Sequence, residues 1–217
     1  MPRGSNRTIP MIKAMESGAR PETFDEAYKI CKLSCGQYDC EAKPLWNIVH
    51  HYSPATIHEI GRQVGGTAFL MACASRNLKR FVSVDIRTYD MADAALKKWF
   101  AYHHIDAELV VSDSRNWTPK EEVDFVYIDG EHTGEAVAAE IAAYKDVATL
   151  IGFHDYADKG WNKHRWCFKD VVKVISEARD AYGWTLAGPR VRSEVVFLTK
   201  KGLARWGPPP QSLPATP

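Results

Sequence analysis

The chain has 217 residues and a formal net charge of +1, and 45% of its residues are hydrophobic. This length fits one domain, and the composition is apolar enough to bury a sizeable core. The near-zero charge excludes a global electrostatic field that would favour nucleic acid or an acidic membrane surface. The sequence has no apolar run of about eighteen residues and no apolar segment near its start. We therefore expect a cytoplasmic protein with neither a membrane span nor a secretory signal.

The chain contains five cysteines. An odd number in a chain of this length argues against a disulfide framework and favours free thiols in a reducing cytosol. Three of them, Cys31, Cys35 and Cys40, are close enough in sequence to be considered as ligands of zinc or an iron–sulfur cluster. The spacing is not CxxC and no fourth ligand is obvious, so free thiols are the favoured interpretation and a metal site is the alternative.

Residues 1–52 predict a helical N-terminal cap or arm ahead of the main domain. Residues 1–22 are polar and contain glycine and proline, which predicts a loose arm or a first short helix. Thr23 is a suitable N-cap for a helix that begins at Phe24. A second helix is expected over about 41–51, where Leu45, Ile48 and Val49 share one face.

From residue 53 onward, short β-branched runs alternate with helical stretches. Strands are predicted over 56–60, 80–86, 107–112, 123–128, 149–154, 184–187 and 194–199, and helices over 66–75, 92–104, 134–144 and 168–182. This alternation predicts an α/β, Rossmann-like fold with a doubly wound, mainly parallel seven-stranded sheet and helices on both faces. The last two strands have no helix between them and predict an antiparallel edge hairpin. We expect the domain to span 53–201, and a disordered, proline-rich tail to occupy 202–217.

The first strand runs into the glycine-rich sequence EIGRQVGGT, residues 59–67. Glycine allows a sharp turn there and lets a ligand touch the backbone. A dinucleotide-binding loop needs a second glycine two residues after the first, against which the pyrophosphate lies. Gln63 occupies that position, so the loop indicates a cofactor without a pyrophosphate, such as S-adenosylmethionine, rather than NAD. The residues predicted to bind it here are Glu59, which would face its ammonium group, Gly61, Gly65, Gly66 and Thr67.

Asp85 ends the second strand, twenty residues after Gly65. Ligands of open α/β sheets bind beyond the carboxyl ends of the strands. A carboxylate at that place can accept hydrogen bonds from both hydroxyls of a ribose. The alternative interpretation is a glycine turn and an unrelated surface acid, but the succession of strand, loop, helix, strand and acid favours cofactor binding.

Acids and a histidine also follow two later strands. Asp129 ends the strand over 123–128, and His154 and Asp155 end the next one. Neighbouring strands lie about 4.8 Å apart, so these side chains can converge on one ion. Two carboxylates and an imidazole suit Mg²⁺ or another divalent cation such as Mn²⁺. In the alternative interpretation, the acids cap the following helices and the histidine fills polar surface.

Four segments together resemble class I S-adenosylmethionine-dependent methyltransferases. EIGRQVGGT and VSVDI resemble their first two motifs, and IDGEHTGEAVAAEI and LIGFHDY resemble small-molecule O-methyltransferase-like families, including those similar to macrocin O-methyltransferase and the cephalosporin-hydroxylase-like proteins. The resemblance covers roughly residues 57–199. It implies methyl transfer to a hydroxyl of a small molecule, an adenine beside Asp113 and Ser114, and cofactor and metal contacts at Asp129. The His154-Asp155 pair departs from the acid–amide pair of catechol-type enzymes.

The chemistry explains the use of a metal. A bound cation lowers the pKa of an acceptor hydroxyl and fixes its oxygen behind the methyl group. A nearby histidine can take the proton, and His132 is the candidate base with His154 in reserve. The segment after Asp155 is aromatic and basic. This segment could shape an acceptor pocket through Tyr156, Trp161, His164 and Trp166. The alternative is that it is only a surface loop.

Three other functions are alternatives to methyl transfer. A hydroxylase-like member of the same fold would use the same metal cluster, and a non-catalytic member would keep the cofactor pocket. A nucleic-acid methyltransferase is disfavoured because Asp129-Gly130-Glu131-His132 replaces the Asn/Asp-Pro-Pro-Tyr motif typical of amino methylation of DNA bases. The expected partner is a small-molecule acceptor, and assembly into a homo-oligomer stays open.

Overall fold

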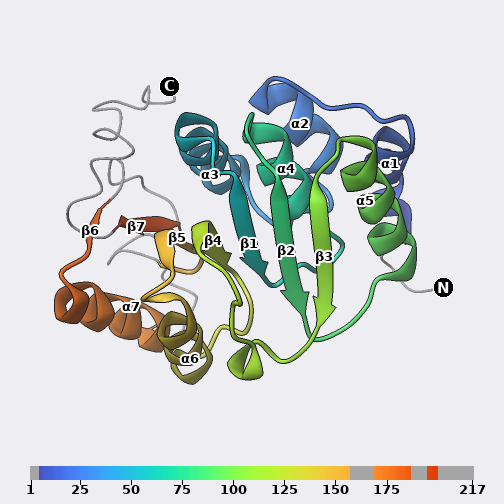
Figure 1. The fold of residues 1–217 in the computed structure, drawn as a ribbon. Coiled ribbons are helices and arrows are strands. Elements are labelled where there is room, and N and C mark those ends of the chain that lie inside the picture. The colour runs from blue at the N-terminus through green and yellow to red at the C-terminus, as the bar shows by residue number, and fades with distance from the viewer. Residues whose placement is uncertain (1–4, 157–168, 187–194, 200–217) are drawn as a thin grey trace.

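A computed structural model of the chain describes residues 5–156, 169–186 and 195–199. Its centre is a seven-stranded sheet in the order β3-β2-β1-β4-β5-β7-β6 (Figure 1). The strands are β1 Thr56–Ile60, β2 Arg80–Asp85, β3 Asp106–Val111, β4 Val123–Ile128, β5 Ala148–Phe153, β6 Thr185–Leu186 and β7 Val196–Thr199. Strands β1 to β5 are parallel, and β7 lies antiparallel between β5 and β6. The predicted Rossmann-like sheet with an antiparallel edge is confirmed.

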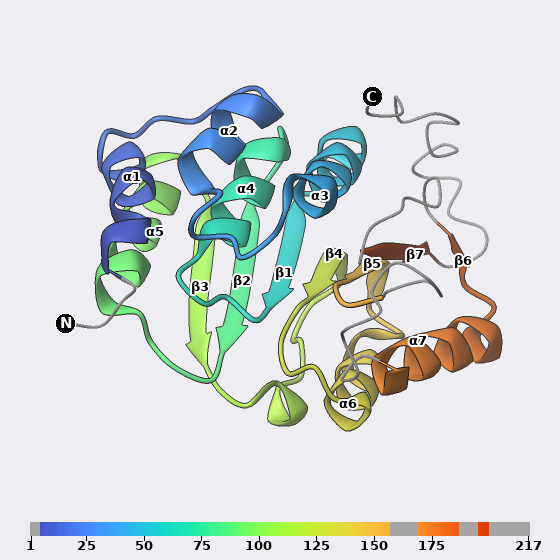
Figure 2. The same ribbon diagram turned by 180° about the vertical axis from the view of Figure 1, so that it is seen from behind.

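Helices cover both faces of the sheet, as predicted (Figures 1 and 2). One group consists of α1 Ser5–Glu16, α2 Phe24–Cys31, α3 Asp39–Tyr52, α4 Gly66–Ala74 and α5 Asp90–Tyr102. The other consists of α6 Gly134–Tyr144 and α7 Lys169–Tyr182. A short 3₁₀ turn, η1 Ser114–Asn116, follows β3. Within the described ranges, no helix combines the length and apolar character that crossing a bilayer requires.

The sheet separates two hydrophobic cores. Ile57, Phe81 and Phe125 pack with the buried side chains of α1 to α5 on one face. Val82 and Val126 pack with α6 and α7 on the other. Successive strand residues point to opposite faces, so a parallel strand covered on both sides is apolar at nearly every position. This explains the continuous apolar runs in the sequence.

The N-terminal helices belong to the first of these cores. Helices α2 and α3 contact α4, and α1 contacts both α5 and α2. The Arg20 guanidinium donates to the carbonyl oxygens of Ala72 and Ser75 at 3.0 and 2.7 Å, and the Trp99 indole donates to the Ala19 carbonyl oxygen at 2.8 Å. Residues 5–16 are therefore a packed helix, the second of the two alternatives that the sequence left open.

Helix α4 shows how closely the N-terminal segment is packed. All nine of its residues are buried, because α2 and α3 cover the side that faces away from the sheet. At Gly66 a methyl group would lie 2.3 Å from the Cys35 backbone nitrogen and 2.4 Å from the Ser34 carbonyl carbon. The chain at 34–35 thus lies directly on the start of α4, and only glycine leaves room for it.

We predict that Gly66→Ala lowers the free energy of unfolding by about 3 kcal/mol, the upper end of typical overpacking costs. The added methyl group would collide with backbone, which outweighs the roughly 1 kcal/mol that alanine gains in helix propensity. Urea unfolding followed by circular dichroism measures this. Gly134→Ala is the matched control: its methyl group would first meet the Asp170 side chain at 3.0 Å, so a smaller loss is expected. Equal stability of parent and Gly66→Ala would contradict the packing described here.

Candidate functional site

A cavity of about 460 Å³ opens at the carboxyl ends of β1, β2 and β4 and at the turn after β3. This is the edge at which open α/β sheets bind ligands, and the volume suits a nucleoside-sized molecule. Five of the residues predicted to bind the cofactor line it: Gly61, Asp85, Asp113, Ser114 and Asp129. Gln63, which replaces the second dinucleotide glycine, lines it as well.

Gly61 is required by a close approach of two backbone segments. Its φ angle is +90°, and a methyl group on it would lie 1.9 Å from the Asp129 carbonyl oxygen. The loop after β4 therefore crosses directly over the loop after β1. The sequence predicts that Gly61 makes room for a ligand. Gly61 lines the cavity, and it also makes room for the segment that carries Asp129.

Asp85 joins two loops of the cavity wall. Its Oδ2 accepts from the Gln63 backbone N–H at 2.7 Å and its Oδ1 from the Arg87 backbone N–H at 3.1 Å. An ionised carboxylate has about four acceptor positions, so Asp85 retains capacity for ribose hydroxyls. A substitution by alanine, however, would leave two backbone donors without their acceptor, so it is not a neutral test of ligand binding.

The other residues predicted from the glycine loop do not line this cavity. The Thr67 hydroxyl donates to the Cys35 carbonyl oxygen at 3.2 Å, and Gly66 packs on the same segment. Gly65, with φ +80°, is the N-cap of α4. The start of α4 thus faces the N-terminal chain, a tertiary contact that the loop sequence does not indicate.

Glu59 is completely buried below the loop. Its Oε2 accepts from the Ser83 hydroxyl at 2.5 Å, and its Oε1 has no hydrogen-bond partner among the described residues. Burial raises the pKa of this carboxyl to about 8, although the Ser83 hydrogen bond and the nearby Arg62 charge act in the opposite direction. A cationic group in the adjoining site would favour the ionised form.

Arg62, within the same loop, is a structural cation that sequence reasoning missed. Its side chain is buried, and its guanidinium donates to both carboxylate oxygens of Asp93 at 3.0 and 3.2 Å. It also donates to the Ser83 carbonyl oxygen at 2.9 Å and the Arg87 carbonyl oxygen at 3.4 Å. Arg62 therefore fixes the loop after β1 to the loop after β2 and to α5.

The predicted acid and histidine cluster is brought together at the ends of β4 and β5. The Nδ1 atom of His154 lies 3.3 Å from Asp129 Oδ1 and 3.1 Å from Asp155 Oδ1. Possible ligand atoms of these three residues all lie within 4.8 Å of one another. His132, the predicted base, is in direct contact with Asp155 through its Nδ1 atom. Asp155 has φ +61°, a left-handed conformation that aspartate tolerates better than most residues.

Histidines offset part of the negative charge within this cluster. Burial lowers the pKa of His154, but contacts with Asp129, Asp155 and Glu41 outweigh it and raise the pKa to about 12. Burial raises the pKa of Asp155, but its bonds to His132 and His154 hold it well below the usual range. A metal ion needs the neutral imidazole, so it would have to replace the His154 proton as the positive charge of the cluster.

The N-terminal segment completes the cluster through two residues that sequence reasoning missed. The Gln37 amide donates to the Tyr127 hydroxyl at 2.8 Å and to Asp129 Oδ2 at 3.4 Å. Glu41 Oε2 lies 3.6 Å from His154 Nε2. Both side chains are buried. Their sequence context, a loop and the first turn of α3, carries no signal of a site that lies more than 85 residues away in the chain.

The remaining predicted residues are the three cysteines and the residues proposed for an acceptor pocket. Cys31 and Cys35 are buried free thiols, and Cys40 is exposed. The Tyr156 hydroxyl lies 3.4 Å from the Ser176 hydroxyl, beside α7. The other residues proposed for an acceptor pocket, Trp161, His164 and Trp166, lie outside the described residues.

We predict that the buried carboxyl of Glu59 makes the protein less stable as the pH rises. Its folded-state pKa of about 8 exceeds the ordinary value of 4.5, so its contribution is complete below about pH 4.5 and lost as the pH rises to 8. Glu59→Gln should remove this loss, up to roughly 5 kcal/mol at about 1.4 kcal/mol per pKa unit. Unfolding free energies measured from pH 5 to pH 8 check it. The exposed control Glu122→Gln should keep the parental slope; an unchanged slope in Glu59→Gln would refute the prediction.

Comparisons with known proteins concern the domain that carries this site. Residues 58–156 match a family model described as a methyltransferase domain. No curated protein sequence matches the chain. Solved structures with the same fold include the SAH-bound methyltransferase PaMTH1 of Podospora anserina, with a TM-score of 0.59 and 14% identity over 93% of this chain and 98% of that one.

Two further structures are O-methyltransferases. The Bacillus cereus enzyme in complex with SAH has a TM-score of 0.56 and 13% identity over 91% of this chain and 100% of that one. TomG of Streptomyces achromogenes, in complex with SAM, has a TM-score of 0.53 and 12% identity over 87% and 90%. None of these three is named as a macrocin O-methyltransferase, so that finer subgroup stays a prediction. The matched family model describes residues 58–156 as a methyltransferase domain, and the fold around them is the Rossmann-like fold of class I methyltransferases.

Proposed function

We propose that this protein transfers the methyl group of S-adenosylmethionine to a hydroxyl of a small molecule, with the assistance of a divalent cation. The observation that carries the proposal is the convergence of Asp129, His154 and Asp155 at one end of the 460 Å³ cavity, where Asp129 belongs to both. Two of the similar structures are named O-methyltransferases, and this similarity supports a hydroxyl as the acceptor.

In this proposal, the cofactor lies along the cavity from Asp85 to Asp129. Asp85 accepts from the ribose hydroxyls while its bonds to Gln63 and Arg87 hold it in place. The ammonium and sulfonium charges lie toward the acids of the neighbouring strand ends. Glu59 acts from below as a buried countercharge rather than through direct contact. Gln63, whose side chain would obstruct a pyrophosphate, is compatible with a cofactor that has none.

The cluster fits a divalent cation by its donor set. It offers two carboxylates and one imidazole with mutual distances below 4.8 Å, and both His154 nitrogens and Asp155 Oδ1 are buried without a well-formed hydrogen bond among the described residues. When bound, the cation would lower the pKa of the acceptor hydroxyl and hold its oxygen. Gln37 would orient Asp129 and His132 would orient Asp155, which fixes the ligand positions.

His132 is proposed as the residue that takes the proton of the acceptor. Its side chain is 46% exposed at the edge of the cluster, whereas that of His154 is only 10% exposed and surrounded by three carboxylates. Contact with Asp155 orients the His132 ring in the manner of a carboxylate–histidine pair. This arrangement favours His132 over His154 as the base.

We expect the protein to bind SAH and not NAD, as measured by calorimetry. Asp85→Asn, which retains one acceptor oxygen, should weaken SAH binding by roughly 10- to 100-fold, because a hydrogen bond to a charged acceptor contributes about 1.5–3 kcal/mol. Its thermal unfolding, recorded in parallel, separates a loss of affinity from a loss of structure. Arg80→Lys, at a partly buried position at the far end of the same strand, is the control and should bind like the parent. Tight NAD binding without any response to SAH would reject the proposal.

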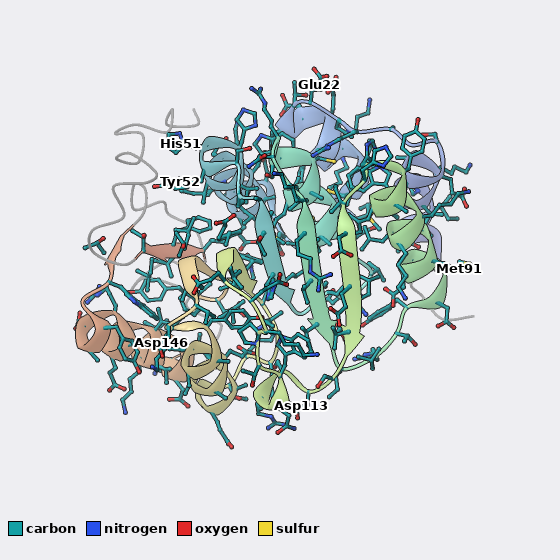
Figure 3. All side chains as sticks on the ribbon, in the orientation of Figure 1. Glu22, His51, Tyr52, Met91, Asp113 and Asp146 are labelled. Atoms are coloured by element: carbon teal, nitrogen blue, oxygen red, sulfur yellow. The ribbon has the colours of Figure 1, made fainter. Side chains whose placement is uncertain are left out.

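We also expect Mn²⁺ to bind the protein with one site, as measured by the loss of free Mn²⁺ signal in electron paramagnetic resonance. Asp129→Asn should weaken Mn²⁺ at least tenfold because a charged ligand is lost, while SAH binding should change far less. The exposed Asp146→Asn should leave Mn²⁺ binding unchanged; Figure 3 labels Asp146 on the outer surface. A protein that binds SAH but not Mn²⁺ would exclude the metal role and leave a histidine as the sole base.

A further inference from the structure

Two side chains of the turn after β3, Asp113 and Ser114, line the cavity and can face the base of a bound nucleoside. The cavity extends from the loops after β1 and β2 to this turn, so a ligand whose ribose meets Asp85 places its base near the end of β3. Asp113 and Ser114 are therefore the candidates to recognise an exocyclic group on that base.

Asp113 is already occupied by its neighbour Arg115. Its carboxylate accepts from the Arg115 backbone N–H at 3.0 Å, from Nε at 3.0 Å and from Nη2 at 2.6 Å. Figure 3 places Asp113 at the outer end of the turn. These bonds hold both carboxylate oxygens in a local ion pair, so Asp113 is poorly placed to accept from a ligand.

Ser114 has a different partner, in a helix that the chain reaches only after β4. Its hydroxyl lies 2.6 Å from Oε1 of Glu140 in α6. Glu140 is only 1% exposed, and its Oε2 is buried with no hydrogen-bond partner among the described residues. A methyl group on Gly130 would lie 3.0 Å from the same Oε1 atom, so the carboxylate lies directly behind two residues of the cavity wall.

A carboxylate at this position is costly for the fold. The neighbouring positions on the same face of α6, Val137, Ile141 and Tyr144, are buried in the hydrophobic core. Burial raises the pKa of Glu140 to about 7, against the lowering effect of the Ser114 hydrogen bond. A leucine would fill the space without this cost, which indicates that the carboxylate has a function.

We propose that Glu140 is a positioning residue that holds the Ser114 hydroxyl as a hydrogen-bond acceptor for the 6-amino group of the cofactor's adenine, and thereby selects aminopurine over oxopurine. A serine hydroxyl has one hydrogen and can otherwise only accept. Once the hydrogen is donated to Glu140, the side facing the cavity can pair with an amino group but not with a carbonyl oxygen. The inference rests on the proposed function, in which this cavity binds S-adenosylmethionine.

The test compares the binding of SAH with that of S-inosylhomocysteine, in which a carbonyl replaces the 6-amino group. Calorimetry is carried out at pH 8, where an ionised Glu140 can only accept. The parent should prefer SAH by roughly tenfold or more, because a site built to accept a hydrogen bond rejects a ligand that lacks the donor. Glu140→Leu frees the Ser114 hydroxyl to donate, so it should bind the oxo analogue more tightly than the parent does. Ser114→Ala should lose affinity for SAH alone.

The outcomes distinguish a failure of the roles of Glu140 and Ser114 from a failure of the proposed function. Both variants should bring the preference to within about threefold of parity. The control is Glu122→Gln, at an exposed position that does not line the cavity, and it should keep the parental preference. A parental preference in both variants would overturn the role of Glu140 and Ser114, and its loss in Asp113→Asn would assign recognition to Asp113 instead. If Glu140→Leu does not fold, Ser114→Ala, at a half-buried position, still decides the role of Ser114. A parent that binds neither ligand would refute the proposed function itself.

Discussion

The crossing of two backbone segments at Gly61 is the constraint on which the site depends. The carbonyl of Asp129 lies so close to Gly61 that no side chain fits between them. The parallel pairing of β1 with β4 brings the two loops to the same edge, and the missing side chain allows them to touch. Asp129 is thereby held where it borders both the cofactor cavity and the acid–histidine cluster. Any side chain at 61 would separate the part that binds the cofactor from the part proposed to activate the acceptor.

Negative charge is concentrated around this crossing, and among the described residues few buried cations offset it. Glu59, Asp85, Asp129 and Asp155 come from four different strand ends, and Glu41 is added from α3. Arg62 is the buried guanidinium nearby, but Asp93 and backbone carbonyls use its donors. His154 and His132 add positive charge beside Asp155. A cationic cofactor and a divalent ion would both be attracted to such a site, which gives a physical reason for placing five acids where their mutual repulsion costs stability.

The sequence predicted what depends on local patterns and missed what depends on distant contacts. The alternation of strands and helices was sufficient for the sheet, including the antiparallel edge, because each strand is apolar and bounded by turn residues. Asp129, His154 and Asp155 could be placed together because parallel strands end at one edge. Gln37, Glu41 and Glu140 could not be found, because each reaches the site only through contacts with residues distant in the chain. The capping pair of Tyr38 and Glu41 already accounts for an acid at position 41. Gly66 and Thr67 were assigned to the ligand by motif, whereas a tertiary contact directs them to Cys35.

The segment that joins α2 to α3 contacts the site and yet exposes two large side chains to solvent. Cys35 lies on the start of α4, and Gln37 reaches Asp129, yet Leu33 and Tyr38 beside them are 55% and 68% exposed. A protease that cleaves after large apolar or aromatic residues can recognise these two side chains, but it can cut only when the short connection detaches from the site. A ligand that holds Asp129 in place would also hold this connection, because the Gln37 amide donates to Asp129. The rate at which this segment is cleaved would therefore measure the fraction of protein whose site is occupied. The measurement needs neither an acceptor nor turnover.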